Sequence, residues 1–463
     1  MQHWVQHVYD HSPVAAQHLM ISLYGWKLSR LRFGGSYERY LNELLRSQYY
    51  SKAELTELQN ERLRALIRQC YDNVPYYARL MRELKLIPND FQTAEDLTKL
   101  PVLEKETVRG NPELFQATNF RERASEIVST SGTTGTSLRI RVDVEGRRKN
   151  YAFFGRLKRW AGVDPLARSA TFAGRAIVPV RQQKPPFWRY NLPMKNLLFS
   201  SFHLSERNMP AYLKRMRDWN PQLIDSYPSS LAILARFGLE HGLEAPHPRA
   251  VITSSETLPE DQRDVIIRAF QTRIFDQYGS AEQVCFISQC ERGRYHVHPE
   301  YGIAEFLPTP AGEPEAAARI VATGLTNWAM PLLRYDMADL AVPAAGECDC
   351  GRKFQIVKQI VGRLDDLVQT PDGRWVGRLD PVFKGLQTVR RAQIIQEALN
   401  RIRVLIVPAK GFSSAQQDSI QHELERRLGP DIEYVFELVN EIPVGPGGKF
   451  RAVISQIERT RSS

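Results

Sequence analysis

Ser129-Thr130-Ser131-Gly132-Thr133-Thr134-Gly135-Thr136 concentrates serine, threonine and glycine in eight consecutive positions. It follows Glu126-Ile127-Val128, a short run that predicts a strand. Glycines let a backbone curl closely around a ligand, and the hydroxyls and amides can donate to several phosphate oxygens at once. The segment is not a Walker A loop, because no Lys-Ser/Thr pair follows its second glycine. Taken alone, it fits a nucleotide-phosphate loop or a Ser/Thr/Gly surface turn equally well.

The segments around this loop predict an α/β fold. Upstream, Ala53–Tyr71 has apolar residues at helical spacing and ends before Val74-Pro75. Downstream, short apolar runs that predict strands alternate with amphipathic stretches that predict helices. Examples are the strands Ala250–Thr253 and Arg273–Phe275, with a helix from Leu258 to Phe270 that starts at Pro259.

The last hundred residues predict a second, smaller α+β unit. We expect a large domain over residues 1–361 and a small C-terminal domain over residues 362–463, joined by a polar turn about which the small domain could move. The predicted elements of the small domain are the turn Gly362–Asp366, a hairpin through Pro371-Asp372-Gly373, strands at Val404–Val407 and Tyr434–Leu438, and a helix over Ser413–Leu428.

The composition is that of an ordinary globular protein. The 463 residues are 43% hydrophobic and 25% charged, with 62 Lys and Arg against 52 Asp and Glu. A net charge of +10 would suit a polyanion, but the basic residues are scattered, and the longest cluster is Arg147-Arg148-Lys149. The sequence contains no RNA-recognition, helix-turn-helix or zinc-finger pattern, so we expect no nucleic-acid partner. We attribute the excess positive charge to the surface and a phosphate-binding cleft.

Neither a membrane span nor a signal peptide is predicted. No run reaches the roughly 18 apolar residues of a span, and the expected location is the cytoplasm. Val14–Phe33 combines apolar residues with Lys27, Arg30 and Arg32. A helix packed on the body of the protein is the favoured interpretation, and a membrane-surface helix, giving peripheral membrane contact, is the alternative.

Five cysteines in such a chain do not indicate a disulfide framework. Cys348 and Cys350 form a close pair, and Cys290 lies upstream, followed by His296 and His298. Three thiolates and one imidazole make a closed tetrahedral zinc site of the structural kind. From spacing alone, buried reduced cysteines are an equally good interpretation.

Four more segments and a glycine-rich tail follow the loop in a recognisable order. They are Ser254–Glu256, Asp276–Glu282, Leu333–Leu340, Gly362–Asp366 and Pro443–Arg451. Together they resemble the adenylate-forming superfamily, and most closely its phenylacetate-CoA ligase-like family, in particular the branch found with capsule and exopolysaccharide biosynthesis. The resemblance covers nearly the whole chain, includes Asn73–Tyr77 and Leu100–Lys105, and extends to the cysteine and histidine positions, which favours a structural Zn²⁺ held by Cys290, His296, Cys348 and Cys350.

The resemblance implies an ATP site. A carboxylate attacks the α-phosphorus of ATP and pyrophosphate leaves, so charge neutralisation and positioning dominate the barrier. Glu282 is the expected Mg²⁺ ligand. Asp339 is expected to accept from the ribose hydroxyls, with Arg363 beside them. The remaining ATP-binding residues are Ser131, Gly132, Thr133, Thr134 and Gly135 at the phosphates, and Ser255, Glu256, Gln277, Tyr278, Gly279 and Ser280 around adenine.

Lys449 is the expected catalytic residue of the first half-reaction, together with Glu282. Its ammonium would reach between the carboxylate and the α-phosphate and offset the developing charge. Asp365 matches the family's hinge position, where rotation of the small domain would exchange Lys449 for the second nucleophile. An exposed lysine in a surface turn is the alternative for Lys449.

The substrate is expected to be a small aryl, hydroxy or amino acid. Candidate contacts are Arg175, Tyr227, Pro228 and Ser229, and the aromatics Phe172, Phe187 and Phe202 line the pocket or belong to the core. Two departures from the family pattern bear on the chemistry. Thr136 stands where many relatives have lysine, and the segment after Asp366 lacks Arg-Gly-x-Asn, which makes CoA one possible acceptor among carrier thiols and amines. A nucleotide-binding homologue without turnover and a basic polyanion-binding protein are the alternatives.

Overall fold

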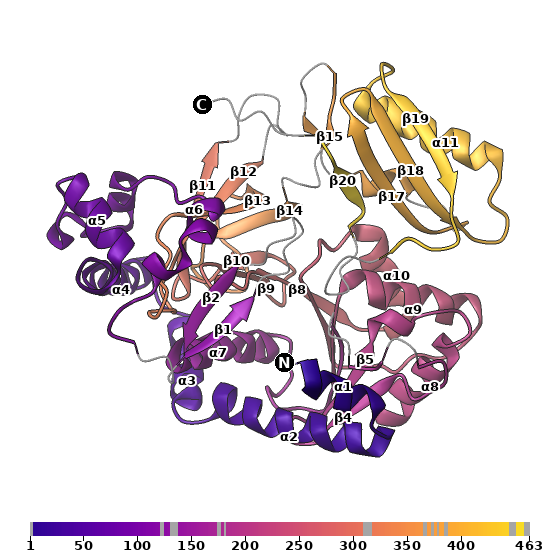
Figure 1. Cartoon of the computed structure of the whole chain (residues 1–463), viewed down its shortest axis with the longest axis horizontal. Coiled ribbons are helices and arrows are strands. Elements are labelled where there is room, and N and C mark those ends of the chain that lie inside the picture. Colours follow the sequence, from indigo (N-terminus) through magenta and orange to yellow (C-terminus); the bar gives the residue numbers. More distant parts are fainter. Residues whose placement is uncertain are drawn as a thin grey trace.

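The computed structural model describes residues 3–120, 125–129, 138–173, 177–179, 182–308, 317–363, 368–371, 375–376, 379–383, 388–443 and 451–457. Figure 1 shows a large α/β body with a smaller α+β part at its upper right, built from the last part of the chain. This is the predicted fold class.

One twelve-stranded sheet forms the centre of the body, in the order β11-β12-β13-β14-β10-β9-β8-β7-β6-β3-β5-β4. One half is parallel apart from its edge strand β4, which runs antiparallel to β5. Its strands are β3 (Ser169–Ala173), β4 (Trp188–Asn191), β5 (Asn196–Ser200), β6 (Leu223–Ser226), β7 (Ala250–Ser254) and β8 (Arg273–Gly279).

The other half of the sheet is antiparallel, and the change of direction comes where β9 pairs with β8. Both predicted strands, β7 and β8, lie next to this junction in the parallel half. The antiparallel strands are β9 (Phe286–Gln289), β10 (Tyr295–Val297), β11 (Gly302–Pro308), β12 (Ala318–Gly324), β13 (Tyr335–Pro343) and β14 (Ile356–Arg363).

Helices cover this sheet, and a separate hairpin flanks the Ser/Thr/Gly loop. The hairpin strands β1 (Ser125–Ser129) and β2 (Arg139–Asp143) are antiparallel, and β1 contains the predicted strand Glu126–Val128. The helices are α1 (His3–His11), α2 (Val14–Phe33), α3 (Tyr37–Ser47), α4 (Lys52–Asn73), α5 (Pro75–Glu83), α6 (Lys105–Gly110), α7 (Val144–Trp160), α8 (Met209–Trp219), α9 (Pro228–Glu240) and α10 (Glu260–Phe270).

Helix α4 shows how local sequence sets these boundaries. The Ser51 side chain accepts from the Glu54 amide and the Glu54 carboxylate accepts from the Ser51 amide, a capping box that starts the helix. At the other end, Val74 is extended because Pro75 follows it, and Pro75 then opens α5. The predicted helix Ala53–Tyr71 is confirmed and extends slightly at both ends.

The C-terminal part has its own sheet, in the order β19-β18-β17-β20, and its own hydrophobic core. The predicted helix and both predicted strands are present. The elements are β15 (Val368–Gln369), β16 (Trp375–Val376), β17 (Val389–Ala398), β18 (Arg401–Pro408), α11 (Ser414–Leu428), β19 (Glu433–Leu438) and β20 (Val453–Ser455). Strands β15 and β16 pair as expected for the hairpin, whose turn residues Asp372 and Gly373 lie outside the described residues.

Helix α2 packs on the body, as the favoured interpretation expected. Its buried side includes Gly25, where a Cβ would lie 2.1 Å from the Asn191 side chain, so glycine allows the helix to lie directly against β4. Among the described residues, no helix combines the length and the apolar character that crossing a membrane requires.

Candidate functional site

The carboxyl ends of β7 and β8 carry two of the sequence motifs. Ser254–Glu256 ends β7, and Gln277–Gly279 ends β8, beside the junction between the parallel and antiparallel halves of the sheet. In open α/β sheets, ligands bind outside the carboxyl ends of the strands, where the strand order or direction changes. The fold therefore brings these segments together at the edge where a ligand is expected.

Tyr278 and Asp339 come into direct contact. The Tyr278 hydroxyl donates to Asp339 Oδ2 at 2.6 Å. Burial, and then the Asp339 charge, raise the pKa of Tyr278 well above its usual range, so the phenol stays a donor. Asp339 also lies opposite Arg363 in the β13–β14 register. The three residues expected at adenine and ribose therefore occupy neighbouring positions.

Glu282 lies in a polar environment that the motifs alone did not reveal. Its Oε1 accepts from the Tyr335 hydroxyl at 3.0 Å and lies 3.4 Å from Lys105 Nζ. Leu103 makes a parallel bridge with Tyr335, so the Leu100–Lys105 segment joins the Leu333–Leu340 segment here. A buried carboxylate fits a hard cation such as Mg²⁺, and the ammonium of Lys105 would offset its charge before the cation binds.

The Ser254–Glu256 turn contacts the proposed substrate segment. Glu256 Oε2 accepts from the Ser229 amide at 3.2 Å, at the start of α9. Tyr227 and Pro228 form the entry to that helix. By contrast, Phe172 and Phe187 are buried in an aromatic cluster with Phe199 and Tyr212, so these two candidates belong to the core.

Tight backbone geometry accompanies these motifs. At Gly279, a Cβ would lie 3.2 Å from the carbonyl oxygen of Cys285, so the close approach of two backbone segments favours glycine. Gln277 is buried, and Ser280 Oγ contacts Met337 Sδ at 4.0 Å.

Left-handed backbone at residues other than glycine costs energy and clusters at functional sites. In the described motif segments it occurs at Ser255, Arg334 and Ala338, with φ of 71°, 50° and 53°. It also occurs at Gln283, directly after the Asp276–Glu282 segment, with φ of 58°.

Several predicted residues lie outside the described residues. These are Ser131, Gly132, Thr133, Thr134 and Gly135 of the loop, Arg175, the hinge Asp365, and Lys449. For Arg363 and Phe202 the backbone is described but the side chain is not. Their roles stay predictions.

Comparison with known proteins finds relatives that match most of the chain. A sequence profile of the CapK C-terminal domain family matches residues 368–456. Protein CapK of Staphylococcus aureus is 27% identical over 98% of this chain and 100% of its own length. Phenylacetate-coenzyme A ligase of Thermus thermophilus is 27% identical over 87% of this chain and 97% of its own.

Over most of its length the chain is therefore similar to phenylacetate-CoA ligase-like proteins of the adenylate-forming superfamily. The fold agrees with a solved 2-hydroxyisobutyryl-CoA ligase in its postadenylation state, with a TM-score of 0.69 at 17% identity over 89% of this chain and 91% of that one.

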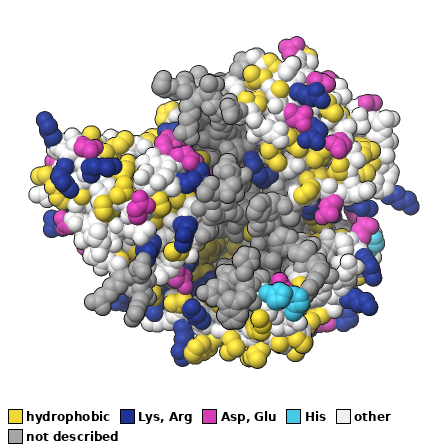
Figure 2. Space-filling model, in the orientation of Figure 1, with side chains coloured by type: hydrophobic (Ala, Val, Ile, Leu, Met, Phe, Trp, Pro, Cys, Tyr) yellow, Lys and Arg dark blue, Asp and Glu magenta, His cyan; other side chains and the backbone are white. Residues whose placement is uncertain are grey.

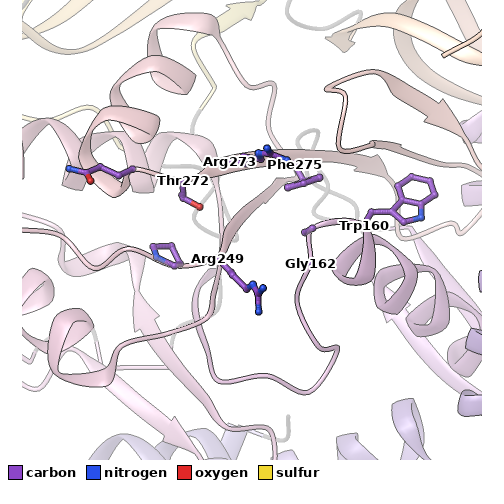
Figure 3. Close-up of a pocket in the computed structure, with 9 residues that line it drawn as sticks. Trp160, Gly162, Arg249, Thr272, Arg273 and Phe275 are labelled. Atoms are coloured by element: carbon purple, nitrogen blue, oxygen red, sulfur yellow. The ribbon is translucent and has the colours of Figure 1, made fainter. Parts of the chain in front are cut away.

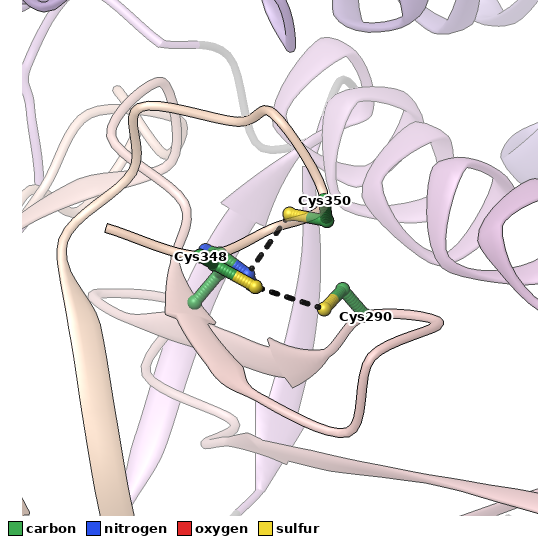
Figure 4. Close-up of side chains that lie close together, drawn as sticks. Cys290, Cys348 and Cys350 are labelled. Atoms are coloured by element: carbon green, nitrogen blue, oxygen red, sulfur yellow. Dashed lines mark hydrogen bonds between the residues drawn. The ribbon is translucent and has the colours of Figure 1, made fainter.

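The protein also contains a Cys/His cluster, at the far end of β9 and β10 from the motifs just described. The ligand atoms of Cys290, His296, Cys348 and Cys350 all lie within 4.8 Å of one another. Figure 4 shows the thiols of Cys290 and Cys348 turned toward each other, with Cys350 beside them. The residues predicted from spacing and resemblance therefore come together. His298 does not join them.

The spacing within the cluster fits a tetrahedral ion. Zn–S bonds of about 2.3 Å place two sulfurs about 3.8 Å apart, and a sulfur and an imidazole nitrogen about 3.5 Å apart. Cys290 Sγ lies 3.8 Å from Cys348 Sγ, and Cys350 Sγ lies 3.4 Å from His296 Nε2. Burial, with Arg352 next in effect, lowers the pKa of His296 to about 4, which keeps the imidazole in its neutral, ligating form.

A fully buried ion pair lies close to this cluster. Arg156 Nη1 is 2.7 Å from Glu300 Oε1, and both side chains are fully buried. His298 Nδ1 lies 2.6 Å from Arg156 Nη2, and Ser47 donates to Glu300 at 2.6 Å. Burial alone would raise the pKa of Glu300, but the Arg156 charge and these hydrogen bonds outweigh it and lower that pKa. No local pattern in the sequence indicates this pair, because its members lie 144 positions apart.

A surface pocket opens at the opposite, amino-terminal ends of β7 and β8. Its volume is about 340 Å³, and Trp160, Gly162, Arg249, Thr272, Arg273 and Phe275 are among its lining residues. In Figure 3 the side chains of Arg249 and Arg273 point in different directions. The two arginines therefore do not converge on one ligand position, and none of the sequence motifs lies here.

Proposed function

We propose that the protein is an ATP-dependent ligase that adenylates a carboxylic acid, releases pyrophosphate and passes the acyl group to a thiol or an amine. The observation that carries the proposal is the meeting of Tyr278, Asp339 and the Arg363 position at the carboxyl edge of the sheet. These residues come from three separate motifs, and similarity to the phenylacetate-coenzyme A ligases supports the same chemistry.

In this proposal, the edge of the sheet at the carboxyl ends of β7 and β8 holds the nucleoside part of ATP. The Asp339 carboxylate accepts from the ribose hydroxyls, since a carboxylate is an acceptor only, and Tyr278 fixes its orientation. Adenine lies between the turn Ser255-Glu256 and Gln277–Ser280, beside Tyr278. The glycine-rich loop 131–135 binds the departing pyrophosphate with its amides and hydroxyls.

Glu282 would hold a Mg²⁺ ion, which neutralises charge on the phosphates when bound. The chain itself holds the Glu282 carboxylate in a fixed position. The Tyr335 hydroxyl donates to it, and Lys105 lies on its other side. Because the Leu103–Tyr335 bridge fixes both neighbours, the carboxylate is oriented before ATP arrives.

The positive charge at the α-phosphate is assigned to Lys449, in the C-terminal domain of residues 362–463. Its ammonium would offset charge as the acid attacks, and a rotation about Asp365 would then remove it and admit the acceptor. One cleft would thereby carry out two incompatible steps in turn.

The acid would lie between Tyr227, Pro228 and Ser229 on one side and Arg175 on the other. The contact of Ser229 with Glu256 supports this placement, because it joins the acid segment to the nucleotide segment. CoA is the acceptor that similarity to coenzyme A ligases favours. A carrier thiol or an amine is the alternative that the missing Arg-Gly-x-Asn segment favours.

Pyrophosphate release with ATP, Mg²⁺ and a panel of aryl, hydroxy and amino acids tests the proposal, with product mass naming the acid and the acceptor. We expect acid-dependent release with at least one member of the panel. Tight ATP binding without release from any acid would instead identify a nucleotide-binding protein without turnover.

We further propose that Cys290, His296, Cys348 and Cys350 hold a structural Zn²⁺. Four protein ligands fill a tetrahedral ion and leave no open position for catalysis. The sulfur and nitrogen separations support this assignment. The ion would fasten the segment that carries Cys348 and Cys350 to the end of β9, where Cys290 lies.

A further inference from the structure

Helix α2 exposes an apolar stripe on the side that faces away from the body. Leu19 and Leu23 are each 61% exposed and Trp26 is 51% exposed, although large apolar side chains on a surface helix usually face inward. Their spacing of four and three residues places them on one face. The opposite face carries Gln17 and Gly25, which are buried against the body.

The stripe widens into a patch through the turn between β4 and β5. The Leu192 amide donates to Ser22 Oγ at 3.2 Å, which holds this turn beside the helix, and the Leu192 side chain is 62% exposed. Figure 2 shows hydrophobic side chains gathered along the lower edge of the molecule, where Figure 1 places α2. We call Leu19, Leu23, Trp26 and Leu192 the α2 patch.

The two chain segments that form the α2 patch carry charges of one sign. Residues 11–37 contain no Asp or Glu, and neither do residues 182–205, which include the β4–β5 turn. Lys27, Arg30 and Lys195 are exposed there, and within the described part of the chain none of them forms a salt bridge. The Arg30 guanidinium lies 3.7 Å above the Trp26 ring, which places a cation beside the apolar stripe.

We propose that the α2 patch docks the protein onto an anionic lipid surface. An interfacial helix inserts Leu and Trp side chains at the headgroup level while Lys and Arg face anionic headgroups, and both components are present here. The charge favours this occupant over a second copy of the chain, because two identical basic patches would repel each other in a symmetric dimer.

Cosedimentation with vesicles tests the proposal. Wild-type protein should bind vesicles of phosphatidylglycerol and phosphatidylcholine, bind vesicles of phosphatidylcholine alone more weakly, and release as salt is raised. Leu19→Ser/Leu23→Ser should lower the partition coefficient by about tenfold. Its matched control is Leu399→Ser/Leu438→Ser, which removes two leucines of 45% and 55% exposure from the C-terminal domain.

A second pair of variants separates the charge from the apolar stripe. Lys27→Gln/Lys195→Gln should weaken binding and flatten its salt dependence, whereas Lys52→Gln/Lys410→Gln, two exposed lysines outside the patch, should not. Thermal unfolding checks that each variant is folded.

Equal binding by patch and control variants would overturn the proposal, and so would a wild-type protein that does not bind anionic vesicles. A dimer that Leu19→Ser/Leu23→Ser converts to a monomer, with no vesicle binding, would assign the patch to a second copy instead.

Discussion

The Tyr278 hydroxyl lies 2.6 Å from the Asp339 carboxylate, although β9, β10 and β14 separate their strands in the sheet order. The sheet must curve strongly to bring the two side chains together. That curvature places the end of the parallel half against the antiparallel half, and it builds the proposed ribose site from residues 61 positions apart in the chain.

Tyr278→Phe should weaken ATP binding by about five- to tenfold, because the Asp339 carboxylate loses the donor that orients it and one hydrogen bond is worth about 1 kcal/mol. Calorimetric titration with ATP measures the change. Tyr295→Phe is a matched control. The Tyr295 hydroxyl donates to the buried Asp276 carboxylate at 2.7 Å, and this contact lies away from the proposed ribose position. Equal losses in both variants would mean that Tyr278 only stabilises the fold.

Glu300→Gln should destabilise the protein by about 3 kcal/mol, because it leaves the Arg156 guanidinium buried without a counter-charge. Denaturant unfolding measures the loss. Glu347→Gln, in a pair whose members are 41% and 68% exposed, should change stability little. A similar small effect in both would show that the buried pair adds nothing beyond an exposed one.

The same pair predicts a pH dependence. Because the pKa of Glu300 is lowered in the folded state, its contribution is complete above the ordinary glutamate pKa of about 4.3 and is lost as the pH falls through the lower folded value. The difference in Tm between wild type and Glu300→Gln should therefore shrink on acidification. A difference that stays constant down to about pH 3 would contradict the assignment.

The purified protein should contain about one zinc per chain, and Cys348→Ser should lose it. Elemental analysis measures the zinc content. Loss of the metal should lower Tm, because the segment that carries Cys348 and Cys350 is then no longer fastened to the end of β9. Cys285→Ser replaces a buried cysteine outside the cluster and should retain the metal. A stable wild-type protein without metal would mean that the four side chains are simply packed together.

Much of the fold followed from local signals. Pro75 and the Ser51–Glu54 capping box set the ends of α4, and the apolar runs of β7 and β8 identified the parallel strands. Spacing alone identified only part of the proposed zinc site, because Cys290 and Cys348 are 58 positions apart and meet only through tertiary structure.

Other contacts had no local signal. Lys105 and Tyr335 both lie in segments that the sequence singled out, yet their convergence on Glu282 depends on the Leu103–Tyr335 bridge. Helix α2 posed a different problem, because its composition fitted either a packed or a membrane-surface helix. The structure shows that one face is packed and leaves the other for the proposed membrane contact.

Exchange of labelled pyrophosphate into ATP, dependent on a carboxylic acid, tests the central claim most directly because it reports adenylation alone. Wild-type protein should catalyse the exchange with an acid from the panel. Lys449→Ala should abolish it while leaving acyl transfer from a supplied acyl adenylate largely intact, and Lys410→Ala, an exposed lysine of the same domain, should retain both steps. No exchange with any acid, or undiminished exchange in Lys449→Ala, would contradict the account.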